Sequence, residues 1–232
     1  TGTLPREWKQ TNICPIFKKG KKCDAANYRP INLASEQILK DAIQEHLTSF
    51  RLISGSQHGF MPGRSCTTNL LEHMNFITRA LDEGQSYDTI LLDYKRAFDR
   101  VPFRHVLAKV RSHGIGGRIL DWISNWTKDR AQRVVLNGEQ SDLIDVISSV
   151  VQGSVLGPIL FIMYINDLDV SIDAANEVHI SKFADDTKLS KTITNLEDSQ
   201  KLQAALDETL RWSKRWGMEL HPDKCVILHF GP

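Results

Sequence analysis

The chain has 232 residues, enough for one large domain or two closely packed lobes with a substantial core. Its content of 41% hydrophobic and 25% charged residues is typical of an ordinary globular protein. The formal net charge of +1 selects no class of partner by itself, and a nucleic-acid enzyme is often more basic than this. The distribution of charge is more informative, because a lysine-rich run lies within residues 17–22.

Cysteine spacing and hydropathy exclude further classes. The four cysteines contain no C-x-x-C pair, which argues against a zinc site or a disulfide framework and favours reduced thiols in an intracellular protein. The longest apolar run, residues 155–165, is too short to span a bilayer and predicts a buried helix. The chain begins at Thr1 and ends directly after a strand-like stretch, so we expect it to be part of a longer protein.

The first third of the chain predicts helices separated by loops. Prolines at positions 5, 15 and 30 and the lysine-rich loop predict irregular structure over residues 1–35. Apolar spacing predicts a helix over 36–50, and glycines and prolines predict a loop over 51–65. A second helix is expected over 67–83, with one side formed by Leu70, Leu71, Met74, Ile77 and Leu81.

The rest of the chain mixes strands with helices. A buried strand is expected over 87–92, ending at Asp93, and a strand pair over 131–137 and 143–151 turns at Asn137-Gly138. The other expected elements are helices over 102–113, 117–128, 155–170 and 196–216, strands over 178–183, 187–189 and 226–230, and inward-facing Leu202, Leu206, Leu210 and Trp216 in the last helix. Without strict alternation of strand and helix, this order favours an α+β fold with a small antiparallel sheet.

Three carboxylates lie at the ends of expected strands. Asp93 closes a buried strand, and Asp185 and Asp186 occupy the tip of an expected hairpin. A carboxylate at the end of a buried strand is costly unless it is paired or binds a cation. Oxygen ligands of this kind suit Mg²⁺, and two such ions support nucleotidyl transfer. An Asp-Asp pair in a hairpin is usually a solvated turn, however, so the spacing alone leaves both interpretations open.

Several further segments accompany the carboxylates in a fixed order. They are CPIFKKG (14–20), NYRPINL (27–33), QHGFMPGRSCTTNL (57–70), LLDYKRAFDRV (91–101), VVQGSVLGPILFIMYINDL (150–168), KFADDTKL (182–189) and LHPDKC (220–225). Together they resemble the successive sequence blocks of reverse transcriptases from non-long-terminal-repeat retrotransposons, over about residues 4–230. Many independent blocks in one order are far more specific than a lone motif.

The resemblance implies a right-hand polymerase. Its fingers are expected over residues 1–84 and its palm over 85–232, as one continuous reverse transcriptase domain without a thumb. Such an enzyme adds deoxynucleotides to a primer 3′-hydroxyl on an RNA template, so the implied partners are RNA template, DNA primer and dNTP, with no membrane. The family also implies two Mg²⁺ ions, with Mn²⁺ as a substitute, and an intracellular location in the nucleus and in cytoplasmic ribonucleoprotein.

The same resemblance assigns roles to individual residues. Asp93, Asp185 and Asp186 match the metal-binding carboxylates, and Lys224 is similar to a lysine that protonates pyrophosphate. Phe98 resembles the steric gate, a flat apolar wall that rejects the ribose 2′-hydroxyl by clash. Four further positions match blocks near the incoming nucleotide and template: Gln152, Gly153, Lys18 and Arg29. Glycine lets backbone approach a ligand closely, and cations suit phosphates. The structural alternatives are a core aromatic for Phe98, a plain turn for Gln152-Gly153 and solvated charges for Lys18 and Arg29.

Two other classes share part of this pattern. A group II intron reverse transcriptase has the same catalytic blocks, although the wording of LLDYKRAFDRV and YRPINL favours the retrotransposon branch. A retrotransposon-derived RNA-binding protein without activity would have no need for three carboxylates facing phosphates. Departures from the family are the pair Lys95-Arg96, where Ser-Lys is frequent, and polar Glu36, Gln37 and Asp41 in a helix that is commonly more apolar. None of these departures touches the acidic residues.

Overall fold

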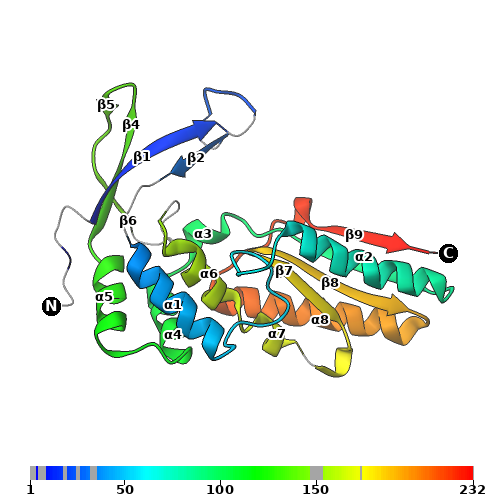
Figure 1. Ribbon diagram of the computed structural model, residues 1–232. Coiled ribbons are helices and arrows are strands. Elements are labelled where there is room, and N and C mark those ends of the chain that lie inside the picture. Colours follow the sequence, from blue (N-terminus) through cyan, green and yellow to red (C-terminus); the bar gives the residue numbers. More distant parts are fainter. Residues whose placement is uncertain are drawn as a thin grey trace. The chain divides into compact units, whose positions relative to one another are not determined.

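The computed structural model describes residues 4, 9–17, 20–24, 27–31, 36–146, 154–172 and 174–231. The chain folds into two compact units, each made from two stretches of sequence. Unit 1 comprises residues 1–50 and 98–161, and unit 2 comprises residues 51–97 and 162–232. Both units combine helices with sheets (Figure 1), which confirms the predicted α+β class. The division into fingers and palm at residue 84 stays a prediction.

Unit 1 contains a small sheet in the order β2-β1-β4-β5, with β6 also paired to β4. Its strands are β1 (Gln10–Phe17), β2 (Tyr28–Ile31), β4 (Arg130–Leu136), β5 (Glu139–Gln140) and β6 (Ile144–Val146). Strand β1 runs antiparallel to β2 and parallel to β4. The predicted turn at Asn137-Gly138 is confirmed, with φ of +53° and +87° at the two positions, the left-handed backbone that this dipeptide favours.

The prediction of irregular structure over residues 1–35 is wrong for β1 and β2. Pro15 and Pro30, which suggested a break, stand opposite each other in the β1–β2 register. The pairing of β1 with β4 covers only Gln10 to Ile13, so Pro15 lies where β1 has a single neighbour. A strand accepts proline where no amide donor is needed, and this is why the prolines did not prevent the sheet.

Helices α1 (Gln37–Ser49), α4 (Phe103–Ser112) and α5 (Gly117–Thr127) complete unit 1, close to their predicted bounds. Each buries one side, through Ile43 and Leu47, Val106 and Val110, and Ile123 and Trp126, respectively. Two short helices, α3 (Ala97–Arg100) and α6 (Gly157–Ile165), contain the points at which the chain passes from one unit to the other. The run Leu156 to Ile165 is buried throughout apart from Pro158, so the predicted buried helix is confirmed there. None of the described helices is long and apolar enough to cross a bilayer.

Unit 2 is built on a four-stranded sheet in the order β7-β8-β3-β9, with every neighbouring pair antiparallel. The strands are β3 (Ser86–Leu92), β7 (His179–Phe183), β8 (Asp186–Ile193) and β9 (Val226–Phe230). Its helices are α2 (Cys66–Asp82), α7 (Leu168–Ser171) and α8 (Leu196–Trp216), with 3₁₀ turns η3 (Ala174–Asn176) and η4 (Pro222–Lys224). The helix predicted over 155–170 is therefore broken between α6 and α7.

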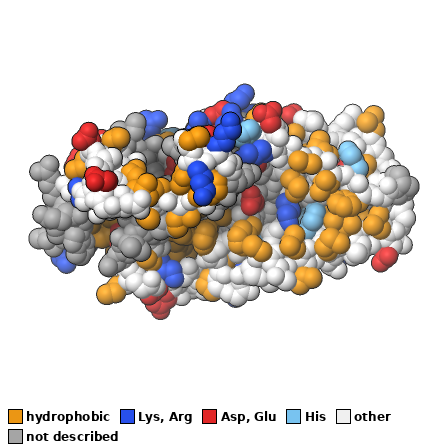
Figure 2. Space-filling view, turned by 90° about the horizontal axis from the view of Figure 1, so that it is seen from above, with side chains coloured by type: hydrophobic (Ala, Val, Ile, Leu, Met, Phe, Trp, Pro, Cys, Tyr) orange, Lys and Arg blue, Asp and Glu red, His pale blue; other side chains and the backbone are white. Residues whose placement is uncertain are grey.

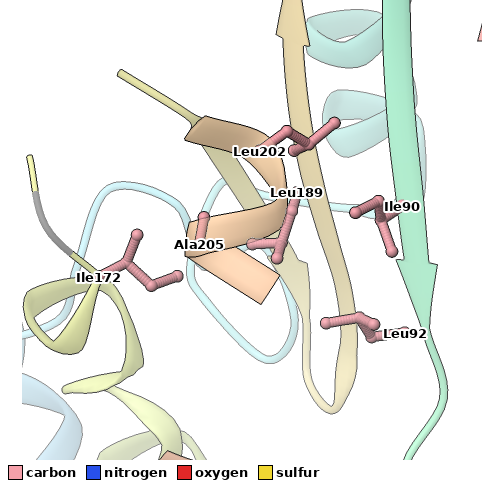
Figure 3. Packing of buried hydrophobic residues seen from close by; sticks show 6 residues of the cluster. All are labelled: Ile90, Leu92, Ile172, Leu189, Leu202 and Ala205. Atoms are coloured by element: carbon pink, nitrogen blue, oxygen red, sulfur yellow. The ribbon is translucent and has the colours of Figure 1, made fainter. Parts of the chain in front are cut away.

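Helices α2 and α8 cover opposite faces of this sheet (Figure 1). Residues Ile90 and Leu92 of β3 pack with Leu189 and with Leu202 and Ala205 of α8 (Figure 3). Tyr87, which points to the other face of β3 because successive side chains alternate, packs with Ile77 and Ala80 of α2 instead. Strand β3 is thus buried on both faces of the sheet, whereas Val226 and Ile227 of the edge strand β9 are exposed.

Helix α2 buries a different side from its most apolar one. Of the five apolar residues expected on one side, only Ile77 is buried; Leu70, Leu71, Met74 and Leu81 are exposed. Figure 2 shows hydrophobic side chains gathered at the surface over the part of unit 2 that carries this helix. The buried side includes the polar residues Asn69 and His73. Asn69 faces inward because its amide donates to Ser181 Oγ at 2.6 Å and accepts from Lys188 Nζ at 2.6 Å.

The loop that precedes α2 extends the sheet of unit 2. Gln57 forms an isolated parallel bridge with Lys182 on the outer side of β7. Asn166, in the break between α6 and α7, accepts from Ser54 N and donates to Leu52 O, both at 2.8 Å. The loop predicted over 51–65 is therefore confirmed as a connection without regular structure, but it is fixed at several points to the sheet and to the chain after α6.

Candidate active site

Strand β3 carries Asp93 to one end of the sheet. Four of its seven residues are buried, and it ends at the buried Leu92. The next side chain, Asp93, is 35% exposed. The backbone at this point is held by the chain before β9, because Asp93 O accepts a hydrogen bond from His221 N at 2.8 Å. Asp93 is therefore a surface carboxylate on a firmly held backbone.

The β7–β8 hairpin brings two further carboxylates to the same end. Phe183 pairs with Asp186, which leaves Ala184 and Asp185 as a two-residue turn. Leu92 of β3 pairs with Thr187 of β8, so the next pair in this antiparallel register is Asp93 beside Asp186. Asp93, directly after β3, thus lies beside Asp186 at the start of the neighbouring strand β8, with Asp185 adjacent in the turn.

The negative charge of Asp93 opposes the ionisation of Asp186 at this end of the sheet. Burial raises the pKa of Asp186 above its usual value, and the negative charge of Asp93 raises it further, while Lys188 acts in the opposite direction. A carboxylate whose ionisation is opposed by burial and by a neighbouring negative charge lies in an electrostatic environment that a cation would relieve. This property distinguishes the site from an ordinary solvated turn.

Lys224 supplies a positive charge close to Asp93. Its Nζ lies 3.3 Å from Asp93 Oδ1, and its side chain is more than half exposed. The short turn η4 holds Lys224 in place, since Lys224 N donates to His221 O at 2.9 Å. An exposed ion pair of this kind contributes little stability, so the ammonium group is free to move toward a bound anion without a large cost to the fold.

Binding of Mg²⁺ by the acidic residues would require further ligands from a substrate. Within the described residues no group of three or more His, Cys, Asp or Glu side chains is arranged to hold a metal. Mg²⁺, however, usually takes one or two protein carboxylates together with waters and substrate phosphates. Asp93 and Asp186, with Asp185 beside them, provide such a set, and the raised pKa of Asp186 is consistent with a place for positive charge.

Phe98 lies in unit 1, at the start of α3. Its ring stacks on the ring of Phe161, with centroids 4.1 Å apart and an angle of 18° between the planes. Phe161 belongs to α6 and is fully buried, whereas Phe98 is half-buried. One side of the Phe98 ring is therefore fixed against the core, which suits a rigid apolar wall.

The side chains of the remaining predicted site residues lie outside what the structure describes. Gln152, Gly153 and Lys18 lie outside the described residues. Arg29 belongs to β2, where it pairs with Ile16 of β1, and its side chain also lies outside the described part of the chain. Their roles stay predictions.

Sequence reasoning assigned no role to Gln57, although this side chain contacts the hairpin directly. Its Oε1 accepts a hydrogen bond from Ala184 N at 2.9 Å. The only indication of a role in the sequence is that Gln57 begins the segment QHGFMPGRSCTTNL, which resembles a family block. What it could not reveal is that this block lies against the turn that carries Asp185, because the two are far apart in sequence.

Comparison with known proteins identifies the family. Residues 16–230 match the family model of the reverse transcriptase (RNA-dependent DNA polymerase). This chain belongs to the reverse transcriptase family. The RNA-directed DNA polymerase from the mobile element jockey of Drosophila melanogaster is 27% identical over 241 residues, which cover 99% of this chain and 26% of that protein. The predicted likeness to non-long-terminal-repeat reverse transcriptases is thereby confirmed.

Two more matches define the extent of the likeness. A Pol polyprotein from the type-1 retrotransposable element R2 of Popillia japonica is 29% identical over 169 residues, covering 68% of this chain and 27% of that protein. The structure of apo telomerase from Candida tropicalis has the same fold, with a TM-score of 0.70 and 13% identity over 98% of this chain and 51% of that one. The reverse transcriptase domain thus spans about a quarter of the length of its curated relatives.

Proposed function

We propose that this domain is an RNA-directed DNA polymerase that adds deoxynucleotides to a primer 3′-hydroxyl on an RNA template. The observation that carries the proposal is the placement of Asp93 beside Asp186 at one end of the unit 2 sheet, where the pKa of Asp186 is raised by burial and by the charge of Asp93. Membership of the reverse transcriptase family supports the same activity.

Asp93, Asp185 and Asp186 are the proposed ligands of two Mg²⁺ ions, with Mn²⁺ as a substitute. Bound there, the ions would lower the pKa of the primer hydroxyl and neutralise charge that develops on the phosphate. The carboxylates orient the reacting groups, and the catalysis consists mainly of positioning and charge stabilisation. Lys224, 3.3 Å from Asp93, donates its proton to the departing pyrophosphate.

Substrate selection is assigned to residues around the incoming nucleotide. The ring of Phe98, supported by Phe161, rejects a ribose 2′-hydroxyl by steric clash. Gln152 and Gly153 are the proposed contacts of the nucleotide and template, and Lys18 and Arg29 are the proposed contacts of phosphates. RNA template and DNA primer are held chiefly through their backbones. An intracellular location, in the nucleus and in cytoplasmic ribonucleoprotein, belongs to the same proposal.

Primer extension tests the proposal. A DNA primer annealed to an RNA template is incubated with dNTPs and Mg²⁺, and the double variant Asp185→Asn/Asp186→Asn serves as the inactive control. We expect extension by the unsubstituted chain alone, with a loss of at least about 100-fold in the variant because charge stabilisation at the phosphate is removed. Equal extension by both proteins would contradict the proposal.

A further inference from the structure

Gln57 makes three hydrogen bonds that join the loop before α2 to the tip of the catalytic hairpin. Its side-chain oxygen accepts from Gly59 N at 2.8 Å and from Ala184 N at 2.9 Å. Its side-chain nitrogen donates to Ala184 O at 3.3 Å. The side chain is 1% exposed, so water does not compete for these bonds. One amide group therefore holds both backbone polar groups of a residue 127 positions away in sequence.

Ala184 requires such a partner for two reasons. Its φ is +57°, the left-handed region that costs a residue with a side chain roughly 1 kcal/mol. It also lies in the two-residue turn between Phe183 and Asp186, where backbone groups fall outside the ladder of strand hydrogen bonds. Ala184 is buried, and a buried N–H or C=O without a partner is destabilising. The Gln57 amide satisfies both groups and thereby fixes the turn in this conformation.

Backbone hydrogen bonds fix the segment around Gln57 to the sheet. His58 N donates to Lys182 O and Lys182 N donates to Ser56 O, both at 2.8 Å, so the two residues flanking Gln57 pair with β7. Arg64 donates to the backbone carbonyl of Gln57 at 2.8 Å. These bonds leave the Gln57 side chain little freedom to follow a movement of the turn.

Gly59 allows the loop to approach the turn at this distance. A Cβ atom built at position 59 would lie 2.3 Å from Ala184 N and 3.1 Å from Gln57 Oε1. Backbone cannot yield to such an overlap as a flexible side chain can, so only glycine permits the contact. The sequence Gln57-His58-Gly59 is therefore matched to the turn by both its hydrogen bonds and its shape.

We propose that Gln57 is a positioning residue that sets the Asp185 and Asp186 carboxylates for divalent metal binding, by fixing the backbone of Ala184. Asp185 follows Ala184 directly, so a rotation of the Ala184 peptide changes the direction of the carboxylates at the tip. A misplacement of about 1 Å can reduce a rate 100-fold. The inference deepens the proposed polymerase function and rests on it for the identity of the reaction.

Three substitutions separate positioning from general stability. Gln57→Met keeps the length of the side chain and removes all three hydrogen bonds. Gln57→Glu is the conservative variant, because a carboxyl oxygen still accepts from Gly59 N and Ala184 N. Leu202→Ala is the matched control, since it removes a core side chain from α8 in the same unit without touching the turn. Should Gln57→Met not fold, Gly59→Ala disturbs the same contact from the loop side.

Hydrogen–deuterium exchange in metal-free protein is the first readout. We expect the peptide that contains Ala184 to exchange at least about tenfold faster in Gln57→Met than in the unsubstituted protein, because the amide loses its acceptor. In Leu202→Ala the exchange of this peptide should change no more than that of the remaining sheet. Unchanged exchange of Ala184 in Gln57→Met would overturn the proposal.

Metal binding and kinetics form the second readout. With Mn²⁺ alone as the probe, followed by electron paramagnetic resonance, we expect about tenfold weaker binding in Gln57→Met, a smaller loss in Gln57→Glu and no change in Leu202→Ala. In primer extension, kcat should fall about 10- to 100-fold with KM for dNTP nearly constant. Wild-type Mn²⁺ affinity in Gln57→Met would overturn the positioning role. If the unsubstituted chain binds Mn²⁺ and the variant does not, yet neither extends a primer, the polymerase function fails and the role of Gln57 stands.

Discussion

The sheet of unit 2 is held in two different ways, by an apolar face against α8 and by a polar edge along β7. On the face, Ile90, Leu92 and Leu189 pack with Leu202 and Ala205 (Figure 3). At the edge, the fully buried Lys182 pairs with Asp169, which also accepts from the hydroxyls of Ser54 and Ser56. Apolar packing tolerates small displacements, whereas hydrogen bonds specify distance and direction. The face thus stabilises the unit, and the edge orients the hairpin that carries the carboxylates.

The largest predicted effect concerns the polar edge. Asp169→Asn removes the carboxylate that pairs with the buried Lys182 ammonium and leaves only the weaker effect of Asp167. Burial already lowers the pKa of Lys182 against the opposing effect of Asp169. Removal of one partner of a buried ion pair costs about 3–5 kcal/mol. We expect a loss of this size in urea unfolding. The double variant Asp169→Leu/Lys182→Met should recover most of it, and a single variant as stable as the parent would contradict the buried pair.

A somewhat smaller effect is expected on the apolar face. Leu202→Ala should lower the free energy of unfolding by about 2–4 kcal/mol, because the transfer free energy is lost and a cavity remains. Leu210→Ala, on the same helix but 37% exposed, is the matched control and should cost less than about 1 kcal/mol. Equal losses for both variants in urea unfolding would show that α8 does not pack as described.

A pH titration distinguishes the α8 face from the α2 face of the sheet. His73 of α2 is buried, and burial lowers its pKa from 6.5 to about 4, with the charges of Lys188 and His179 contributing in the same direction. The unfolded chain therefore binds a proton that the folded chain does not, and stability falls as the pH drops from 6.5 toward 4. The loss is at most about 3 kcal/mol.

The variant His73→Gln provides the control for this titration. It should flatten the dependence of the unfolding free energy on pH between 6.5 and 4, because the titrating group is removed. The six buried side chains of the α8 face do not titrate, so Leu202→Ala should lower stability without changing this slope. A slope that persists in His73→Gln would assign the pH dependence to another group.

The smallest effect on stability is expected for the support of Phe98. Phe161→Leu keeps an apolar residue in α6 but removes the stacked ring, worth about 0.5–1.5 kcal/mol. We expect the ratio of dNTP to rNTP incorporation to fall about 3- to 10-fold, since a wall that can shift rejects a hydroxyl less well. Met163→Leu, another buried α6 substitution, should leave the ratio unchanged.

Local patterns of the sequence predicted much of this architecture, and contacts between distant segments account for the rest. The hairpin around Asp185 and the strand before Asp93 could be predicted from apolar runs and turn residues in the local sequence. The position of Lys224 beside Asp93 is consistent with the family block that contains Lys224. Strand β1 was missed because proline tolerance depends on which neighbour a strand has. The buried side of α2 was misjudged because Asn69 finds its partners, Ser181 and Lys188, more than 100 positions later. The contact of Gln57 with Ala184 could not be predicted for the same reason, because the two residues are 127 positions apart.

The proposed action of Asp93 with the hairpin carboxylates in catalysis is tested most directly by one matched pair of variants. Asp93→Asn and Asp88→Asn each remove one charge from the β3 segment. Asp88, however, lies opposite Lys191, away from the hairpin turn, and its carboxylate contacts His229 Nδ1 at 2.8 Å. Primer extension is measured together with thermal unfolding. We predict that Asp93→Asn abolishes extension without unfolding the chain and that Asp88→Asn keeps extension near the parental level. Retained synthesis by Asp93→Asn, or loss of its fold, would contradict the account.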